Sequence, residues 1–408
     1  MKKTALFLGL TVLLALLVSA GCGLFGKKVT PFETSTGIRY KEVLSTASVK
    51  VSAAYMALKG RCPVYSEDGK WSTAEEAGWA QGYYPGLVWL LYQSTRDTVD
   101  YNLALGWCAA LEDRRNDKTG IGLGQLFYRT HVIGYQITSN RRFHEVALDA
   151  ANSLAERFVR AGYIPAWGEP GDSVLARRMN IETMMALDLL YWASKATGNP
   201  KYLLRANSHA LFTMRNLVNA DGRSLHMADF NPATGRPLMG KHSRLTGNSK
   251  YSPKGYSPST AWALGQAWAL YGFTSAYSNA GNTLFLNTAR RAADYFLANL
   301  PEDGIPYWDF DLPDSEKKQK DTGAAAIAAA ALLKLSRLCP NEADRMRYRA
   351  AAEKIVSSLT TGYLNHGSGG LLNQGVYDMN QGLGVGGSTV WGDYFYIEAL
   401  LFLRDYKT

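Results

Sequence analysis

The chain has 408 residues, of which 47% are hydrophobic, and it carries a formal charge of +9. Its basic residues occur in pairs such as Arg114-Arg115 and Arg177-Arg178 rather than in a longer run, which argues against a nucleic-acid partner. A scattered basic surplus suits an acidic polysaccharide outside the cytoplasm, and ordinary charge on exposed helix faces is the alternative explanation.

The N-terminus predicts a secretory signal. A start of MKK is followed by a short apolar run over residues 5–20 and then by LVSAGC, which ends at Cys22. This ending resembles a bacterial lipobox, and the resemblance implies removal of residues 1–21 and lipidation of Cys22. Because Gly23 rather than Asp follows, it also implies a lipid anchor in the outer membrane of a Gram-negative bacterium, on its periplasmic or surface face. Residues 22–36 then form a polar tether, and a plain secretory signal is the alternative.

Helical periodicity dominates the remaining residues, 37–408, and no later stretch has linker composition, so we expect a single domain. Some candidate helices are rich in aromatic residues, Gly and Ala, and others are more charged, which suggests an inner and an outer layer. Two such layers predict an all-α fold, an (α/α)6 barrel of six helical hairpins. The predicted helices, about twelve, span residues 38–58, 79–95, 97–113, 121–138, 141–160, 178–197, 200–218, 258–280, 282–300, 321–338, 342–360 and 390–406.

Long stretches rich in Gly, Pro, Asp and Asn separate several of these helices, and loops of this length are usually functional. A short strand hairpin is expected near 223–240, around NPATG. The stretches span residues 61–72, 166–173, 221–257, 301–320 and 365–388.

The ten tryptophans are many for a helical domain. Trp79, Trp167 and Trp262 lie at a predicted helix start or in the loop before one, and Trp268 follows on the same helix as Trp262. Flat aromatic faces stack on the apolar faces of sugar rings, so we expect this group to line a barrel mouth that binds sugar. Core packing is the alternative for any single member.

Several familiar chemistries lack their sequence signals. The histidines show no HExxH spacing, and the cysteines left after cleavage, Cys62, Cys108 and Cys339, lack metal spacing and predict mostly buried thiols with at most one disulfide. No GxSxG motif is present. The glycines of GIGLG at 120–124 follow no strand and have no acidic residue placed for a ribose, which argues against a dinucleotide site. We therefore expect no metal and no cofactor.

Carboxylates remain as candidates for catalysis. The stretch NIETMMALDLLYW, residues 180–192, has an apolar stripe at helical spacing that is headed by Glu182. A glycosidase ordinarily uses two carboxyl groups, one of them often with a pKa raised by burial, and a Glu on a buried face meets the second condition. The alternative is a Glu favoured by the helix dipole in a first turn capped by Asn180. Further candidates are Asp117, Asp321 and Asp393.

Five blocks of the chain are specific enough to indicate a family: WAQGYYPGLVWLLY (79–92), STAWALGQAWALYGF (259–273), PEDGIPYWDFDLPD (301–314), KDTGAAAIAAAALL (320–333) and WGDYFYIEALL (391–401). They resemble glycoside hydrolase family 88, the unsaturated glucuronyl hydrolases. The resemblance extends from about residue 37 to 406 and implies an (α/α)6 barrel. It also implies an acidic oligosaccharide substrate, left by a polysaccharide lyase and bearing a 4,5-unsaturated uronic acid at its non-reducing end.

The resemblance implies an unusual reaction. An aspartic acid protonates C4 of the enol-ether double bond, water adds at C5, and the resulting hemiketal opens to release the next sugar. The family places this acid in a block like IDNMMNLELLFWA, which here reads IETMMALDLLYWA, so Glu182 takes the position of the catalytic acid/base. His226 also matches the family and is expected to contact substrate or relay a proton. The matching substrate-binding residues are Trp79, Trp167, Trp262 and Trp268.

Three positions depart from the family pattern. A second aspartate, in a block like THDLGFM, becomes Gly122, and an arginine in a WxRGQAW block becomes Leu264. A glutamine becomes Lys254, whose point charge partly replaces that of the arginine. We therefore expect an atypical active site, in which Asp117 is the nearest carboxylate in sequence that could stand in for the missing aspartate.

Two other classes of function stay open. One is a different carbohydrate-active enzyme on the same barrel, either a hydrolase of saturated sugars or a uronide lyase, because a fold does not fix a function. Tyr128, Arg129, His131 and Lys254 have the side-chain types that a lyase needs. The other is a non-catalytic, sugar-binding lipoprotein.

Overall fold

The computed structural model describes residues 39–73, 78–238 and 253–405, and its described residues from Tyr40 onward form one compact unit. The predicted signal peptide, the tether and the lipidation site Cys22 lie outside the described residues. None of the helices in the described ranges is long and apolar enough to cross a membrane.

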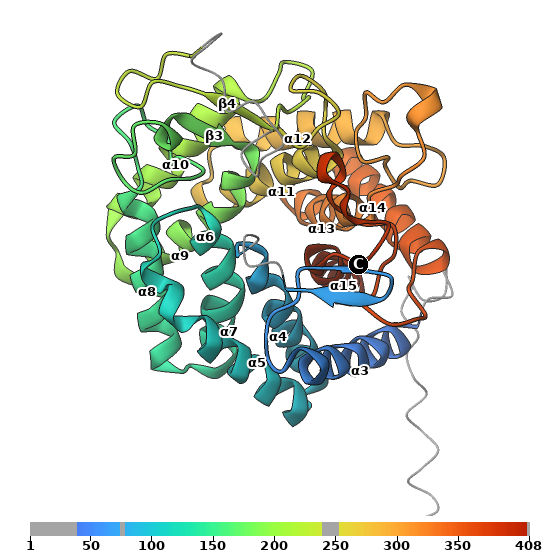
Figure 1. The fold of residues 1–408 in the computed structure, drawn as a ribbon. Helices are drawn as coiled ribbons and strands as arrows, with labels where there is room; N and C mark the ends of the chain where they lie inside the picture. The colour runs from blue at the N-terminus through green and yellow to red at the C-terminus, as the bar shows by residue number, and fades with distance from the viewer. Residues whose placement is uncertain (1–38, 74–77, 239–252, 406–408) are drawn as a thin grey trace, which may run out of the picture. The chain divides into compact units, whose positions relative to one another are not determined.

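The helices form an inner ring surrounded by an outer ring (Figure 1). Helix α15 packs against α4, which closes the inner ring, so the predicted six-hairpin barrel is confirmed. The inner helices are α4 (Tyr83–Thr95), α6 (Gly122–Phe127), which continues through η4 (Tyr128–Val132) into α7 (Ile133–Thr138), α9 (Leu187–Thr197), α11 (Ala263–Ala280), α13 (Thr322–Leu338) and α15 (Val390–Arg404). The outer helices are α3 (Tyr40–Leu58), α5 (Thr98–Leu111), α8 (Arg141–Glu156), α10 (Pro200–Asn216), α12 (Thr283–Ala298) and α14 (Glu342–Gly362).

Side-chain size and polarity decide which ring a helix joins. Helix α13 reads TGAAAIAAAALLKLSRL and is buried on almost every side, as expected for a helix that is apolar all round. Helix α8 reads RRFHEVALDAANSLAE and buries only one stripe, formed by residues such as Phe143, Val146 and Leu154. The alternation of apolar and charged helices along the chain therefore becomes the alternation of inner and outer rings.

At one end of the barrel, four inner helices pass into outer helices through the same short connection. A residue in the left-handed conformation ends the inner helix, and the next residue is an Asn or Asp whose side chain caps the outer helix. These pairs are Arg96 and Asp97, Ser139 and Asn140, Gly198 and Asn199, and Gly281 and Asn282.

The long loops lie at the opposite end, where the inner helices begin, and they contain three two-stranded antiparallel sheets. The strand pairs are β1 (Tyr65–Glu67) with β2 (Lys70–Ser72), β3 (Arg178–Asn180) with β4 (Met227–Asp229), and β5 (Val376–Asp378) with β6 (Leu383–Val385). Short 3-10 turns are η2 (Ala80–Gly82), η3 (Glu112–Asn116), η5 (Leu175–Arg177), η6 (Ile181–Ala186), η8 (Asp314–Glu316) and η9 (Met379–Gln381).

The predicted helix over 178–197 is wrong in its first half. Residues 178–180 form β3 because they pair with β4, nearly fifty positions further along the chain. The Asn180 side chain then caps the 3-10 helix η6, and α9 begins only at Leu187. Glu182 therefore lies on a 3-10 turn beside a strand, not on an α-helix.

Other predicted boundaries are close to the structure. The predicted 258–280 helix begins at Ala263 because Thr260 and Ala261 hydrogen-bond to Asp309 and Asp311. The predicted hairpin near 223–240 exists as a tight turn closed by a bridge between Phe230 and Pro237, while β4 pairs with β3. The cysteines within the described ranges, Cys62, Cys108 and Cys339, are buried free thiols.

Candidate active site

A pocket of about 530 Å³ opens among the long loops, at the end of the barrel where the inner helices begin. Seven of the predicted site residues line it together: Trp79, Gly122, Trp167, Glu182, His226, Lys254 and Trp262. Trp268 does not line it, because its side chain is fully buried and packs edge-on against Trp79 at a ring-centroid distance of 6.5 Å. Trp268 therefore supports Trp79 from within the barrel core. The prediction that Trp268 contacts sugar directly is wrong.

The β3–β4 pair brings Glu182 and His226 together. Asn180 lies opposite Met227 in the register, and the backbone N–H of Ile181 donates to the carbonyl of His226 at 2.8 Å. Glu182 follows Asn180 closely and His226 directly precedes Met227. The two residues therefore leave the paired strands side by side. A buried Arg178–Asp229 ion pair fastens the other end of the same two strands.

Two glycines let neighbouring helices press on η6, the turn that carries Glu182. A Cβ at Gly124 would lie 2.4 Å from Cα of Ala186, and a Cβ at Gly272 would lie 2.5 Å from Cβ of Met184. Real Cβ atoms do not come this close to other atoms, so only glycine permits the packing. These contacts hold the turn from two sides and fix where Glu182 points.

The Glu182 carboxylate is held through one oxygen. Its Oε2 accepts from the Asn180 amide and faces Nε2 of His226 at 3.4 Å. The Asn180 carbonyl oxygen accepts from the backbone N–H of Thr183 at 3.2 Å and from its hydroxyl at 2.7 Å. This leaves the Asn180 NH₂ group to donate to Glu182. Among the described residues, Oε1 of Glu182 has no hydrogen-bond partner.

The tautomer of His226 follows from its second contact. Nδ1 accepts a hydrogen bond from the backbone N–H of Lys254 at 2.8 Å, so a neutral ring carries its proton on Nε2. That proton points at Glu182. The ring is only 3% exposed and packs on Trp262 at 4.7 Å between centroids. His226 is thus a fixed donor to Glu182 rather than a mobile surface group.

Aromatic rings form much of the pocket wall. Trp79 stacks on Trp391 with centroids 5.1 Å apart and planes inclined by 30°. Trp167 is held on the wall that carries Gly122, because Gly120 and Trp167 form a backbone bridge. With Trp262 beside His226, the pocket offers flat faces of the kind that stack on sugar rings.

Lys254 is not a free cation. Its ammonium pairs with the buried carboxylate of Asp378, which also accepts from the side chain of Gln381 at 2.6 Å. Lys254 was expected to supply the positive charge of an arginine at the position of Leu264. That charge is already paired with the carboxylate of Asp378. Leu264 itself lines the pocket with an apolar side chain.

The other carboxylates divide into two groups. Asp117 and Asp172 line the pocket. Partial burial opposes the shift at Asp117, but hydrogen bonds from Thr119 and Arg114 lower its pKa, and backbone N–H groups of Leu175 and Val174 lower that of Asp172. Both are therefore held ionised and suit binding better than proton donation.

Asp321 and Asp393, the other two candidates, do not line the pocket. Asp321 caps α13, and Asp393 accepts from the backbone N–H groups of Leu371 and Leu372 at 2.9 and 3.1 Å. Burial raises the pKa of each to about 7. Burial outweighs the backbone hydrogen bonds, which act to lower both pKa values, and each carboxyl group supports a helix or a loop away from the pocket. Within the described ranges, no cluster of three or more His, Cys, Asp or Glu residues could hold a metal ion.

Gly122 is fitted closely against Trp79. A Cβ at this position would lie 3.0 Å from both Cα and Cβ of Trp79. A side chain of any kind would thus have to move a pocket-forming tryptophan. Close packing against Trp79 therefore favours glycine at this position.

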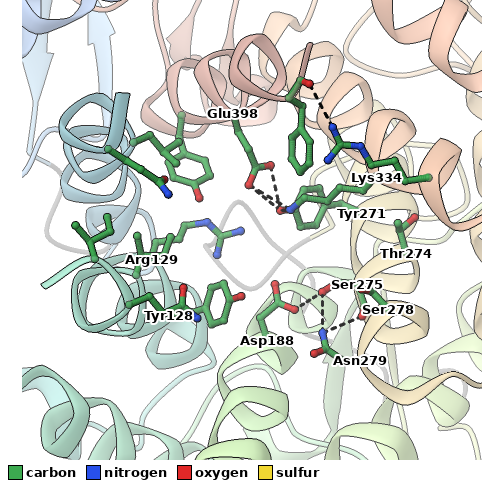
Figure 2. Close-up of a pocket in the computed structure, with 18 of the residues that line it drawn as sticks. Tyr128, Arg129, Asp188, Tyr271, Thr274, Ser275, Ser278, Asn279, Lys334 and Glu398 are labelled. Atoms are coloured by element: carbon green, nitrogen blue, oxygen red, sulfur yellow. Dashed lines mark hydrogen bonds and ion pairs between the residues drawn. The ribbon is translucent and has the colours of Figure 1, made fainter. Parts of the chain in front are cut away.

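The residue set proposed for a lyase is not assembled. Tyr128 and Arg129 line a different cavity, at the other end of the barrel (Figure 2). His131 is buried between Phe127 and Phe143, and burial lowers its pKa to about 3. Only Lys254 lies with Glu182, so this lyase hypothesis is wrong in its residues.

Sequence reasoning missed two residues that shape the site. Asn180 was expected only as a helix cap, although its position two residues before Glu182 is a signal that it could reach the carboxylate. Asp378 was not singled out, because it lies 124 positions from Lys254 and only the fold brings the two together.

Comparison with known proteins gives a consistent result, although no protein-family model matches the chain. An unsaturated glucuronyl hydrolase of Bacillus sp. strain GL1 is 34% identical over 343 residues, which cover 82% of this chain and 88% of that protein. The crystal structure of such an enzyme from Bacillus sp. GL1 superposes with a TM-score of 0.83 at 31% identity, over 90% of this chain and 97% of that one.

Two streptococcal relatives extend the comparison. An unsaturated chondroitin disaccharide hydrolase of Streptococcus pneumoniae is 30% identical over 349 residues, covering 83% of this chain and 85% of that protein. An Asp-to-Asn mutant of the unsaturated glucuronyl hydrolase from Streptococcus agalactiae, complexed with dGlcA-GalNAc6S, has a TM-score of 0.76 at 26% identity, over 93% of this chain and 96% of that one.

Proposed function

Because the chain belongs to the unsaturated glucuronyl hydrolases of glycoside hydrolase family 88, we propose that it hydrolyses unsaturated uronyl oligosaccharides released by polysaccharide lyases. The observation that carries this proposal is the fixed Glu182 carboxyl group in a tryptophan-lined pocket. One of its oxygens is occupied by Asn180 and His226, and the other has no partner among the described residues.

Glu182 is the proton donor. With two donors directed at Oε2, the proton of the neutral carboxyl group resides on Oε1, the oxygen that can meet a substrate. Glu182 is mostly buried, with its side chain 17% exposed, and it lines the pocket, so its carboxyl group is reached from the pocket. The donor must lie within hydrogen-bonding reach of C4 in the bound uronide.

The atoms of the reaction balance through this one group. Oε1 gives its proton to C4 of the enol ether, and positive charge develops at C5 and the ring oxygen. Water adds its oxygen to C5 and returns a proton to Glu182. The product at C5 is a hemiketal, whose C5–O5 bond breaks to give a ketone at C5 and a hemiacetal at C1. The hemiacetal then collapses to an aldehyde, which breaks the bond from C1 and releases the next sugar as an alcohol. Glu182 then serves as acid and as base in one cycle.

The site is atypical because one carboxylate performs this work. Gly122 replaces the second aspartate that the family pattern contains, and Asp117 and Asp172, ionised at neutral pH, remain as groups that can accept hydrogen bonds from substrate hydroxyls. Lys254 has three N–H donors, so it can contact the uronide carboxylate while it pairs with Asp378. Stacking on Trp79, Trp167 and Trp262 replaces part of the lost arginine contact.

Absorbance of the conjugated double bond tests the proposed reaction. Unsaturated disaccharides made by chondroitin, hyaluronan and heparin lyases should lose this absorbance when the enzyme is added. Absorbance that instead appears with intact polysaccharide would identify a lyase. Binding without any change in absorbance would identify a sugar-binding protein.

We also propose that the protein is a lipoprotein anchored at Cys22 in the outer membrane. The sequence MKKTALFLGLTVLLALLVSAGC supports this proposal through its charged start, apolar run and lipobox-like end. Labelled fatty acid should be incorporated into the protein and lost in Cys22→Ser. An unlabelled wild-type protein in the soluble periplasmic fraction would contradict the anchor.

A further inference from the structure

A second cavity of about 600 Å³ opens at the end of the barrel opposite the active site (Figure 2). Most of its lining comes from the C-terminal halves of the inner helices, and its volume is within the range of small-molecule sites. Its lining includes charged, hydroxyl and amide side chains: Arg129, Asp188, Ser275, Asn279, Lys334 and Glu398.

An aromatic layer separates this cavity from the active-site pocket, and the two share no lining residue. Tyr83 lies between them. Its ring is 6.1 Å from Trp79 on the active-site side, and Arg129 lies over it at 4.5 Å on the other. Trp268 and Phe395 pack edge to face in the same layer, 5.8 Å apart. The second cavity is therefore not an extension of the first.

Arg129 is the feature that points to a ligand. Its side chain is 1% exposed, yet Nε and Nη1 have no hydrogen-bond partner among the described residues. Buried guanidinium donors are normally paired. In Figure 2 the guanidinium extends into the middle of the cavity, between Asp188 and Glu398. Contacts with the rings of Tyr83 and Tyr394 stabilise its charge but leave these N–H groups unused.

A local change of helix geometry places Arg129 there. Residues Tyr128–Val132 form a π-helical segment within the otherwise continuous inner helix of α6 and α7. Such π segments insert an extra residue into an α-helix and often occur at functional sites. The barrel thus departs from regular geometry at the residue whose donors lack partners.

The other cation in the centre of the cavity, Lys334, is paired with Glu398. Glu398 accepts from the Tyr271 hydroxyl at 3.1 Å and from Lys334 at 3.2 Å. Asp188 accepts from the Ser275 hydroxyl, and no ion pair within the described residues joins it to Arg129. Of the two cations in the centre of the cavity, Arg129 and Lys334, only Arg129 has no direct acidic partner among the described residues.

The net charge of the lining is positive. Four cations, Arg96, Arg129, Lys334 and Arg337, face two carboxylates, Asp188 and Glu398. Cations at helix C-termini offset the negative ends of the helix dipoles, which accounts for Arg96 and Arg337 at the last turns. That role does not account for Arg129, which lies deeper, on the π segment.

We propose that this cavity is a second binding site and that its ligand is a small polyhydroxylated carboxylate, such as a uronic acid. Arg129 binds the carboxylate. Asp188, Ser275 and Asn279 exchange hydrogen bonds with hydroxyl groups, since together they offer both acceptors and donors. A doubly charged anion such as phosphate fits less well, because it would meet repulsion from Asp188 and Glu398.

Calorimetric titration of the purified protein with glucuronate tests the site, because this saturated sugar has no double bond to hydrate. Glucuronate should bind, and Arg129→Met should weaken binding at least tenfold. Glucose and inorganic phosphate should each bind at least tenfold more weakly than glucuronate. No measurable glucuronate binding, or phosphate binding that is equally tight and equally dependent on Arg129, would overturn the proposal.

Two tryptophan variants keep the test decisive if Arg129→Met fails to fold. Ser278 is exposed on α11 and lines the cavity, so Ser278→Trp should block the cavity and abolish glucuronate binding. Ser45 is exposed on α3 and lines none of the described cavities, so Ser45→Trp should bind normally. Binding that survives Ser278→Trp but is lost in Trp79→Ala would place the sugar in the active-site pocket and overturn the proposal.

Discussion

Nε2 of His226 lies 3.4 Å from Oε2 of Glu182, while the other ring nitrogen of His226 accepts from the backbone N–H of Lys254. One histidine therefore joins the Glu182 carboxyl group to the loop that carries Lys254. The strand pairing of 178–180 with 227–229 sets this arrangement. The active site thus depends on contacts between loops that are far apart in the sequence.

Replacing His226 should impair catalysis by releasing Glu182. His226→Ala removes the donor to Oε2 and the acceptor for Lys254, so the carboxyl group loses one of its two anchors. We expect kcat to fall about 10²-fold, the usual cost of misplacing a catalytic group by roughly 1 Å. His144→Ala is the matched control, because His144 packs on Tyr135 and Trp192 away from the pocket. Equal kcat in the two variants would exclude the positioning role.

Placing an aspartate at position 122 should destabilise this protein. Its Cβ would lie 3.0 Å from Trp79, and overpacking of this kind costs about 1–3 kcal/mol of unfolding free energy. Gly122→Ala should show most of the same loss, because the clash begins at Cβ, whereas Gly120→Ala has its nearest contact at 3.7 Å and should be neutral. Denaturant unfolding measures all three. A stable and more active Gly122→Asp would show that the wall accepts the family aspartate.

Asp321 should make the stability depend on pH. Burial raises its folded-state pKa to about 7, above the ordinary value of about 3.9. Between these values the folded protein binds more protons than the unfolded chain, so the unfolding free energy falls as pH rises from about 4 to 7.

Asp321→Asn cannot titrate and keeps an oxygen for the N–H of Ala324. We expect it to be more stable than wild type at pH 8, by about 2–4 kcal/mol from the linkage relation, and similar to wild type at pH 4. Asp97→Asn changes an exposed N-cap and corrects for the effect of capping. A stability difference between Asp321→Asn and wild type that is the same at both pH values would contradict a buried, neutral Asp321.

Local sequence signals predicted the helices well and the contacts around them less well. Apolar periodicity and Asn or Asp caps locate the helices within a few residues because both depend on neighbours along the chain. The start of β3 at Arg178 depends on a partner strand beyond position 226, and periodicity cannot show that. The π segment at Tyr128–Val132 is equally hidden, because one extra residue barely changes an apolar pattern.

The same limit applies to the site. Glu182, His226 and three tryptophans could be placed from motifs that resemble a family. The pairing of Lys254 with Asp378 could not, nor could the burial of Trp268 beneath Trp79, since both depend on packing between distant segments. The cavity around Arg129 gathers residues from all six inner helices, and no short motif marks it.

The most direct test of the proposed function compares Glu182→Gln with Glu169→Gln, since both residues line the pocket and both changes remove one carboxylate. The measurement is the initial rate at which an unsaturated disaccharide loses its double-bond absorbance. We expect Glu182→Gln to lose roughly 10³-fold or more in kcat with an unchanged unfolding transition, and Glu169→Gln to remain active. Wild-type turnover in a folded Glu182→Gln would contradict the assignment of Glu182 as acid and base.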